Sequence, residues 1–129
     1  MQPSADHANL QGLQVFLVED EPLVALMIED MLNELGCVVV GKARNLVEAM
    51  SWAEVMPAID FAILDVNISG QAILPVADML ARRQVPLVFS TGYGSNELLQ
   101  LYPGSRLLAK PYGTDALANA LTSFHHTRH

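Results

Sequence analysis

Short apolar runs alternate along the chain with segments in which apolar residues recur every three or four positions. An unbroken apolar run of about four to eight residues is typical of a buried strand, and the three-to-four spacing is typical of an amphipathic helix. The apolar runs predict strands at Leu13–Glu19, Cys37–Lys42, Ile59–Asp65, Pro86–Thr91 and Arg106–Lys110.

Helical spacing appears between and after these runs, at Pro22–Leu35, from Asn45 through Ala53, at Ile73–Arg83 and from about Thr114 to Phe124. Pro22 suits the first turn of the first helix, and Gly36 suits its C-terminal stop. Asn45 and Glu48 have the spacing of a capping box at the start of the second helix. The apolar stripe of the first helix predicts that its members belong to the core: Val24, Met27, Ile28, Met31, Leu32 and Leu35.

Strand and helix alternate five times, which predicts an α/β fold with a parallel sheet covered on both faces. The length favours the flavodoxin-like (βα)5 doubly wound sheet with strand order 2-1-3-4-5. The fourth helix is expected to be short or irregular, because the stretch "NELLQLY" has room for barely two helical turns. In such sheets the functional site lies beyond the carboxyl ends of the strands, where strands one and three are neighbours.

Length and charge narrow the possible functions. The 129 residues favour one domain, which we place at residues 13–125, after a flexible leader (residues 1–12) and before a tail (residues 126–129). The net charge of -7 argues against a nucleic-acid partner, because such partners are bound mainly through Lys and Arg. No apolar run suits a membrane span, and the N-terminus lacks the features of a secretory signal. With a single cysteine, Cys37, these features predict a cytoplasmic protein.

Polar residues follow the apolar runs at the predicted strand ends. Glu19 and Asp20 end the first strand, Asp65 the third, Thr91 the fourth and Lys110 the fifth. Clustered carboxylates repel one another, so at least one would be protonated unless a cation were supplied. Mg²⁺ meets this need, and Lys110 adds a fixed positive charge, a combination suited to phosphoryl transfer. Asp65 is a competent nucleophile that could form an aspartyl phosphate.

In this order, "ED" after strand one, "LDVN" at strand three, "ST" at strand four and "KP" after strand five resemble the receiver domain of two-component response regulators. The resemblance covers about Leu13–Phe124. It implies that Asp65 is the phosphoacceptor, that Thr91 hydrogen-bonds the phosphoryl group and that Lys110 pairs with it. The implied Mg²⁺ ligands are Glu19 (through water), Asp20, Asp65 and the backbone carbonyl of Asn67. A sensor histidine kinase or a phosphotransfer protein is the implied donor. The resemblance also implies that the protein is not an enzyme beyond catalysing its own phosphorylation and dephosphorylation.

Some features depart from the common receiver pattern. The loop "VNISGQ" after Asp65 is short, and "PLVFSTGYG" resembles the subgroup nicknamed FATGUY, found in alphaproteobacterial stress and light-signalling regulators. Most receivers carry an aromatic residue three positions before the lysine, where this chain has Leu107. Tyr93 or Tyr112 could take its place, so the predicted switch residues are Thr91, Gly92, Tyr93 and Tyr112.

These features predict a stand-alone receiver that is phosphorylated on Asp65 in a Mg²⁺-dependent step and signals to a downstream protein partner by a conformational change. Two alternatives stay open. One is a receiver-like binding module that acts without phosphorylation, which an active Asp65→Asn variant would favour. The other is a flavodoxin-like or phosphatase-like enzyme with a carboxylate nucleophile, and a flavin protein of this kind should be yellow.

Overall fold

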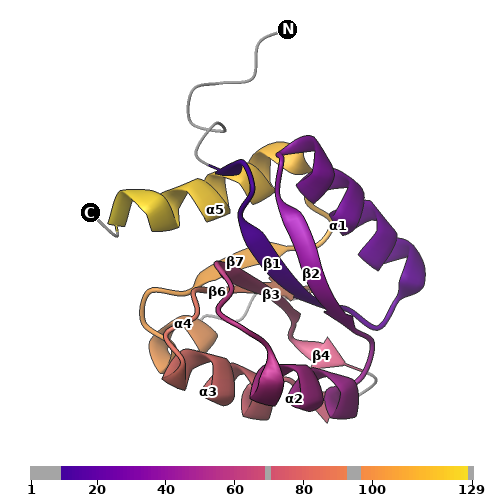
Figure 1. Cartoon of the computed structure of the whole chain (residues 1–129), viewed down its shortest axis with the longest axis vertical. Helices are drawn as coiled ribbons and strands as arrows, with labels where there is room; N and C mark the ends of the chain where they lie inside the picture. Colours follow the sequence, from indigo (N-terminus) through magenta and orange to yellow (C-terminus); the bar gives the residue numbers. More distant parts are fainter. Residues whose placement is uncertain (1–9, 69–70, 93–96, 128–129) are drawn as a thin grey trace, which may run out of the picture.

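The computed structural model describes residues 10–68, 71–92 and 97–127, and its centre is a five-stranded parallel sheet (Figure 1). The strands are β1 (Gln14–Val18), β2 (Val38–Ala43), β3 (Phe61–Asp65), β6 (Leu87–Thr91) and β7 (Arg106–Ala109). Their order across the sheet is β2-β1-β3-β6-β7, which confirms the predicted order 2-1-3-4-5. The carboxyl ends of β1 and β3 therefore lie side by side.

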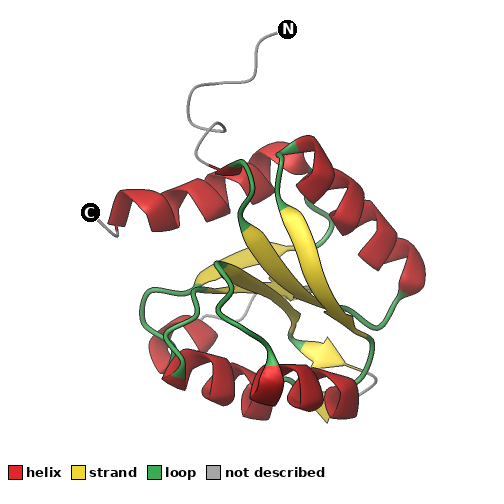
Figure 2. Ribbon diagram, viewed as in Figure 1, coloured by secondary structure: helices red, strands yellow, loops and turns green. Residues whose placement is uncertain are grey.

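Helices cover both faces of the sheet (Figure 2). One face carries α1 (Pro22–Glu34) and α5 (Thr114–Thr127), and the other carries α2 (Leu46–Val55), α3 (Leu74–Arg82) and α4 (Glu97–Leu101). Alternate strand residues point to opposite faces, so the sheet separates two hydrophobic clusters. On β6, for example, Phe89 faces α2, α3 and α4, whereas Val88 faces α1 and α5. No helix in the described part of the chain is long and apolar enough to cross a membrane.

The predicted helix ends are confirmed by local geometry. Pro22 opens α1, and Gly36, which has a positive φ of 84°, follows its end. At the start of α2 the Asn45 side chain accepts a hydrogen bond from the backbone N–H of Glu48 at 2.9 Å. The Glu48 carboxylate in turn accepts from the backbone N–H of Arg44 at 2.9 Å. These bonds satisfy amide groups that have no partner inside a helix.

The prediction that Met27 belongs to the core is wrong, because its side chain is 58% exposed. Successive helix residues are about 100° apart. The helix turns Ile28 and Leu32 to the sheet, where both are buried. Met27 therefore lies at the margin of the buried face, while Met31 is partly buried against the cluster.

Some boundaries differ from those predicted. Leu10, inside the predicted leader, is fully buried, and its carbonyl accepts a hydrogen bond from the Cys37 thiol at 3.5 Å. The helix α5 continues through Thr127 into the predicted tail. After Asp65 a small antiparallel pair forms from β4 (Asn67–Ile68) and β5 (Gln71–Ala72). Two-residue strands leave no periodic pattern, so the sequence did not signal them.

Candidate functional site

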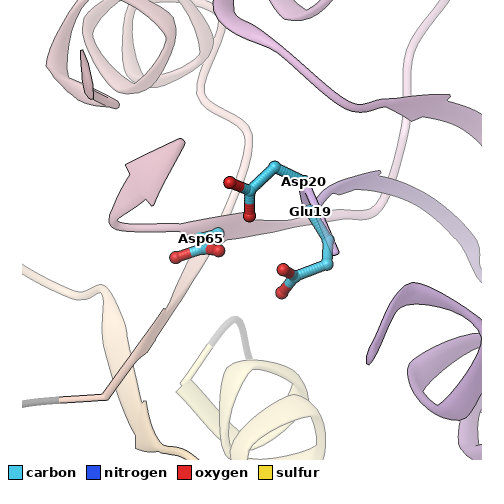
Figure 3. Close-up of side chains that lie close together, drawn as sticks. All are labelled: Glu19, Asp20 and Asp65. Atoms are coloured by element: carbon cyan, nitrogen blue, oxygen red, sulfur yellow. The ribbon is translucent and has the colours of Figure 1, made fainter. Parts of the chain in front are cut away.

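The carboxyl ends of β1 and β3 bring three carboxylates together (Figure 3). Glu19 and Asp20 follow β1 and Asp65 ends β3, and an oxygen from each lies within 4.8 Å of the others. The register pairs Val18 with Leu64, which sets Glu19 and Asp65 side by side at the next position. Glu19 and Asp65 are buried, whereas Asp20 is half-buried. The structure thus places the three acidic residues singled out in the sequence in one cluster.

Lys110 reaches this cluster from the end of β7. Its ammonium group lies 2.9 Å from Glu19 Oε1 and 3.1 Å from Asp65 Oδ2, so one cation bridges two buried carboxylates. Its backbone N–H donates to the Thr91 carbonyl at 2.7 Å, and the Lys110–Pro111 peptide bond is cis. Lys110 is therefore held at the site by its backbone as well as by its charge.

Burial sets the protonation behaviour of this cluster. Burial raises the pKa of Glu19 to about 7, although the bond from Lys110 and the backbone N–H of Glu21 oppose the rise. The nearby charge of Asp65 adds to it. Burial alone would lower the pKa of Lys110, but its bonds to Glu19 and Asp65 outweigh burial and raise that pKa above its ordinary value. The lysine stays charged, and one lysine does not compensate three carboxylates.

The remaining polar residues singled out in the sequence lie around the same edge of the sheet. Thr91 ends β6 and is buried, and Gly92 follows it. Asn67 begins β4 and follows Asp65 by only two residues in the sequence. Tyr93 lies outside the described residues.

Leu107, which occupies the position of the usual aromatic residue, and the tyrosines near the site divide between the two faces of the sheet. Leu107 packs against the cluster under α2, α3 and α4, whereas Tyr112 packs against the cluster under α1 and α5. Tyr102, which sequence reasoning missed, contacts the Phe89 ring with centroids 5.5 Å apart and donates a hydrogen bond to Asp78 at 2.5 Å. Tyr102 thus holds the end of α4 to α3. Tyr102 lies four residues after Leu98, a spacing that places two residues on the same face of a helix, and this spacing could have indicated its packing.

The donor set fits a hard divalent cation. Carboxylate oxygens from β1 and β3 converge on one point, and oxygen ligands are those that Mg²⁺ prefers. Burial is the main reason that the pKa of Glu19 is raised, the nearby charge of Asp65 adds to the rise, and Lys110 opposes it only in part. A divalent cation would further offset the charge of the carboxylates.

Comparisons with known proteins agree with this geometry. Residues 15–122 match the family described as response regulator receiver domain. The phyllosphere-induced regulator PhyR of Methylorubrum extorquens is 30% identical over 102 residues, which cover 77% of this chain and 38% of PhyR. The chain therefore spans less than half the length of that relative.

Solved structures show the same fold. The solution structure of SdrG from Sphingomonas melonis Fr1 has a TM-score of 0.74 at 39% identity, covering 88% of this chain and 97% of SdrG. The receiver domain of a sensor histidine kinase from Pseudomonas aeruginosa PAO1 has a TM-score of 0.74 at 23% identity, covering 88% and 97% of the two chains. That receiver was solved with a magnesium ion coordinated in its active-site cleft.

Proposed function

The chain belongs to the response regulator receiver domain family, and on this premise we propose that it accepts a phosphoryl group on Asp65 and transmits the signal to a partner protein. Receiver domains are signalling modules rather than classical enzymes. The observation that carries the proposal is the cluster in which Lys110 bonds Asp65 at 3.1 Å while Glu19 and Asp20 flank the same carboxylate. A nucleophile, a fixed cation and two further acidic ligands thus share one small site.

Phosphoryl transfer depends mainly on positioning and charge neutralisation. A carboxylate oxygen of Asp65 attacks the phosphorus atom, an O–P bond forms, and the bond from phosphorus to the donor nitrogen or oxygen breaks with its electron pair on the leaving group. Lys110 pairs with a phosphoryl oxygen, and the Thr91 hydroxyl donates to another. In the later dephosphorylation, water attacks the phosphorus atom, the bond from phosphorus to the Asp65 oxygen breaks, and inorganic phosphate leaves as the Asp65 carboxylate is restored.

The acidic cluster is the proposed metal site. Glu19 (through water), Asp20, Asp65 and the carbonyl of Asn67 would hold Mg²⁺, and oxygens of the three carboxylates lie close enough together to share one ion. When bound, the ion would neutralise the carboxylates and the phosphoryl oxygens.

We expect a protein donor, either a sensor histidine kinase or a phosphotransfer protein, and a downstream protein partner. Exposed apolar side chains on α1 support a protein contact beside the site: Leu23 is 76% exposed, Leu26 54% and Met27 58%. They begin three residues after Asp20, on the helix that leads away from the cluster. Thr91 and Gly92, with Tyr93 and Tyr112, remain our proposed switch residues, and the cytoplasm is the proposed location.

The direct test is phosphorylation by acetyl phosphate with Mg²⁺, followed by phosphate-affinity electrophoresis. Wild-type protein should acquire an acid-labile phosphoryl group as acetate leaves, whereas Asp65→Asn should remain unmodified because its amide is a poor nucleophile. Asp30→Asn, an exposed site on α1, is the matched control and should behave as wild type. Unmodified wild-type protein would refute the proposal. A downstream signal that Asp65→Asn preserves in cells would favour the phosphorylation-independent binding module.

A further inference from the structure

Tyr102, which directly follows α4, ties this helix to two other elements. With five residues, α4 is too short to be stable by itself, so its position depends on contacts with the rest of the fold. Leu98 is its buried residue, and the backbone N–H of Tyr102 donates to the Leu98 carbonyl at 2.9 Å. The Tyr102 side chain therefore extends the end of α4 toward its neighbours.

The two ties go to β6 and to α3. The Tyr102 ring lies against Phe89 of β6, with ring centroids 5.5 Å apart. Its hydroxyl donates to the Asp78 carboxylate of α3 at 2.5 Å, a length typical of a hydrogen bond to a charged acceptor. Burial, the bond to Asp78 and the charge of Asp78 raise the pKa of Tyr102, so the phenol stays protonated at neutral pH. The Leu74 carbonyl, one turn before Asp78 on α3, lies 3.5 Å from the same hydroxyl and is a second acceptor.

A mostly apolar cavity separates α4 from the segment that follows the proposed phosphorylation site. Its volume is about 190 Å³, and its lining includes Val66, Ile73 and Leu74 from this segment and Leu98 and Leu101 from α4. Val66 directly follows Asp65, and its carbonyl accepts a hydrogen bond from the backbone N–H of Ile73 at 3.2 Å. Closing such a cavity would bury its apolar lining and add packing contacts. There is thus room for α4 to move toward this segment.

The strand β6 connects this arrangement to the phosphoryl group. Thr91 lies two residues after Phe89, so both side chains start on the face of the sheet that carries α3 and α4. Residues 92–96 are all that separates Thr91 from the first residue of α4. In the proposed function the Thr91 hydroxyl donates to the phosphoryl group, which draws the end of β6 toward Asp65. This displacement reaches α4 along the chain and through the contact of Phe89 with Tyr102.

We propose that the Tyr102–Asp78 hydrogen bond is a latch that holds α4 in its resting position and opens when Asp65 is phosphorylated. The inference rests on the proposed function of Asp65 and concerns how the signal leaves that site. The latch is closed in the metal-free protein, which is the resting arrangement. In the active arrangement α4 closes the cavity, and the Tyr102 hydroxyl moves from Asp78 to the nearby Leu74 carbonyl. Tyr102 is thus a positioning residue that acts through α4 and does not touch the phosphoryl group.

Removing the latch should favour the active arrangement, because a bond made only in the resting arrangement stabilises that arrangement alone. Tyr102→Phe removes the donor, and Asp78→Ala removes the acceptor at an exposed position. In the presence of Mg²⁺, each variant should bind beryllofluoride, a phosphoryl analogue, about three- to tenfold more tightly than wild type. Each should also unfold at a lower urea concentration, because the resting fold has lost a hydrogen bond.

Backbone amide NMR follows the position of α4 directly. The signals of residues 97–102 in wild type should shift when beryllofluoride binds. In Tyr102→Phe without beryllofluoride, the same signals should lie part of the way along that shift, because the active arrangement is more populated. A merely structural role for Tyr102 would not displace the signals in this direction.

Arg83→Lys is the matched control, because it weakens a different tie to α3. Arg83 donates to the carbonyls of Ala53 at 2.8 Å and Met56 at 2.6 Å, at the end of α2. This variant should also unfold at a lower urea concentration. Its beryllofluoride affinity and its α4 signals should be those of wild type.

Thr91→Val tests the connection between the site and the latch. It removes the hydroxyl that draws on β6 and keeps a β-branched side chain of similar shape. Beryllofluoride bound to this variant would no longer distinguish the two positions of α4, so adding Tyr102→Phe should leave its affinity unchanged.

The experiment compares wild type with these variants by beryllofluoride titration, amide NMR and urea unfolding. Tighter binding and displaced α4 signals in both latch variants, absent in Arg83→Lys and lost in the Thr91→Val background, support the latch. Wild-type affinity in Tyr102→Phe and Asp78→Ala overturns it, and so does tighter binding that persists with Thr91→Val. Wild-type protein that neither binds beryllofluoride nor accepts phosphate from acetyl phosphate refutes the proposed function itself. A wild type that does both, with unaffected latch variants, refutes the latch alone.

Discussion

At the scale of single residues, Glu19 shows what the site costs the metal-free protein. Its side chain is 1% exposed and bonds Lys110 at 2.9 Å, yet burial still raises its pKa to about 7. A buried ion pair does not recover the full loss of hydration, least of all when Asp65 shares the same cation. Residues selected for binding a cation are thus a local source of instability without one.

Glu19→Gln should therefore stabilise the metal-free protein at neutral and alkaline pH. Because the folded pKa of about 7 exceeds the ordinary 4.5, the folded protein binds this proton more tightly, and its stability falls as pH rises from 4.5 to about 7. Above this range the glutamine variant should be more stable by on the order of 1 kcal/mol, with a flatter pH profile. Urea unfolding in EDTA across this range measures both, with the exposed Glu54→Gln as control. A variant as pH-sensitive as wild type would contradict the account.

At the scale of elements, side chains fasten helices to one another where the backbone alone leaves groups unpaired. Arg83, just past α3, donates to the carbonyls of Ala53 at 2.8 Å and Met56 at 2.6 Å, at the end of α2. The Ala53 carbonyl lies in the last turn of α2 and Met56 is the C-cap residue, so these carbonyls have no partner within the helix, and the helix dipole favours a cation at this end. One guanidinium group therefore caps α2 and joins it to α3.

Arg83→Lys should lower the free energy of unfolding by about 1 kcal/mol, although the charge is kept. A lysine ammonium lacks the planar fork that lets two guanidinium nitrogens reach two carbonyls at once. The neighbouring Arg82→Lys is the matched control, because Arg82 is also exposed but makes no such pair of bonds to helix carbonyls within the described part of the chain. Equal urea midpoints for the two variants would show that the charge alone stabilises this helix end.

At the scale of the whole molecule, the site joins elements that are far apart in the chain. Asp65 and Lys110 are 45 residues apart in sequence and meet at 3.1 Å, and Glu19 comes from a third strand. The unfolded chain cannot bring these groups together. Any cation that binds the assembled site must therefore stabilise the entire fold.

Mg²⁺ should raise the free energy of unfolding by about 2.7 kcal/mol when it is present at 100 times its dissociation constant. Asp20→Asn should lose most of this stabilisation, since it removes a carboxylate from the cluster while leaving the Lys110 bridge between Glu19 and Asp65 in place. Urea unfolding in Mg²⁺ and in EDTA at matched ionic strength measures the difference. An equal Mg²⁺ effect in the variant would place the cation elsewhere.

The sequence by itself determined the features that depend on neighbours along the chain. The apolar runs, the cap at Asn45 and the stop at Gly36 follow from local periodicity and backbone preference. A polar residue directly after a buried parallel strand must emerge at the carboxyl edge of the sheet, so the meeting of Asp65 with Glu19 was also predictable.

Only the tertiary structure decided how deeply each side chain is buried and what it touches. Met27 is exposed although it fits the apolar stripe, because the seating of α1 on the sheet selects Ile28. Ser90 is one polar residue within an apolar run. The pairing of β6 with β3 sets it opposite Asp65, and the loop after β7 brings Tyr112 beside it. Burial and pairing across the sheet depend on contacts between distant segments, and local sequence carries no record of them.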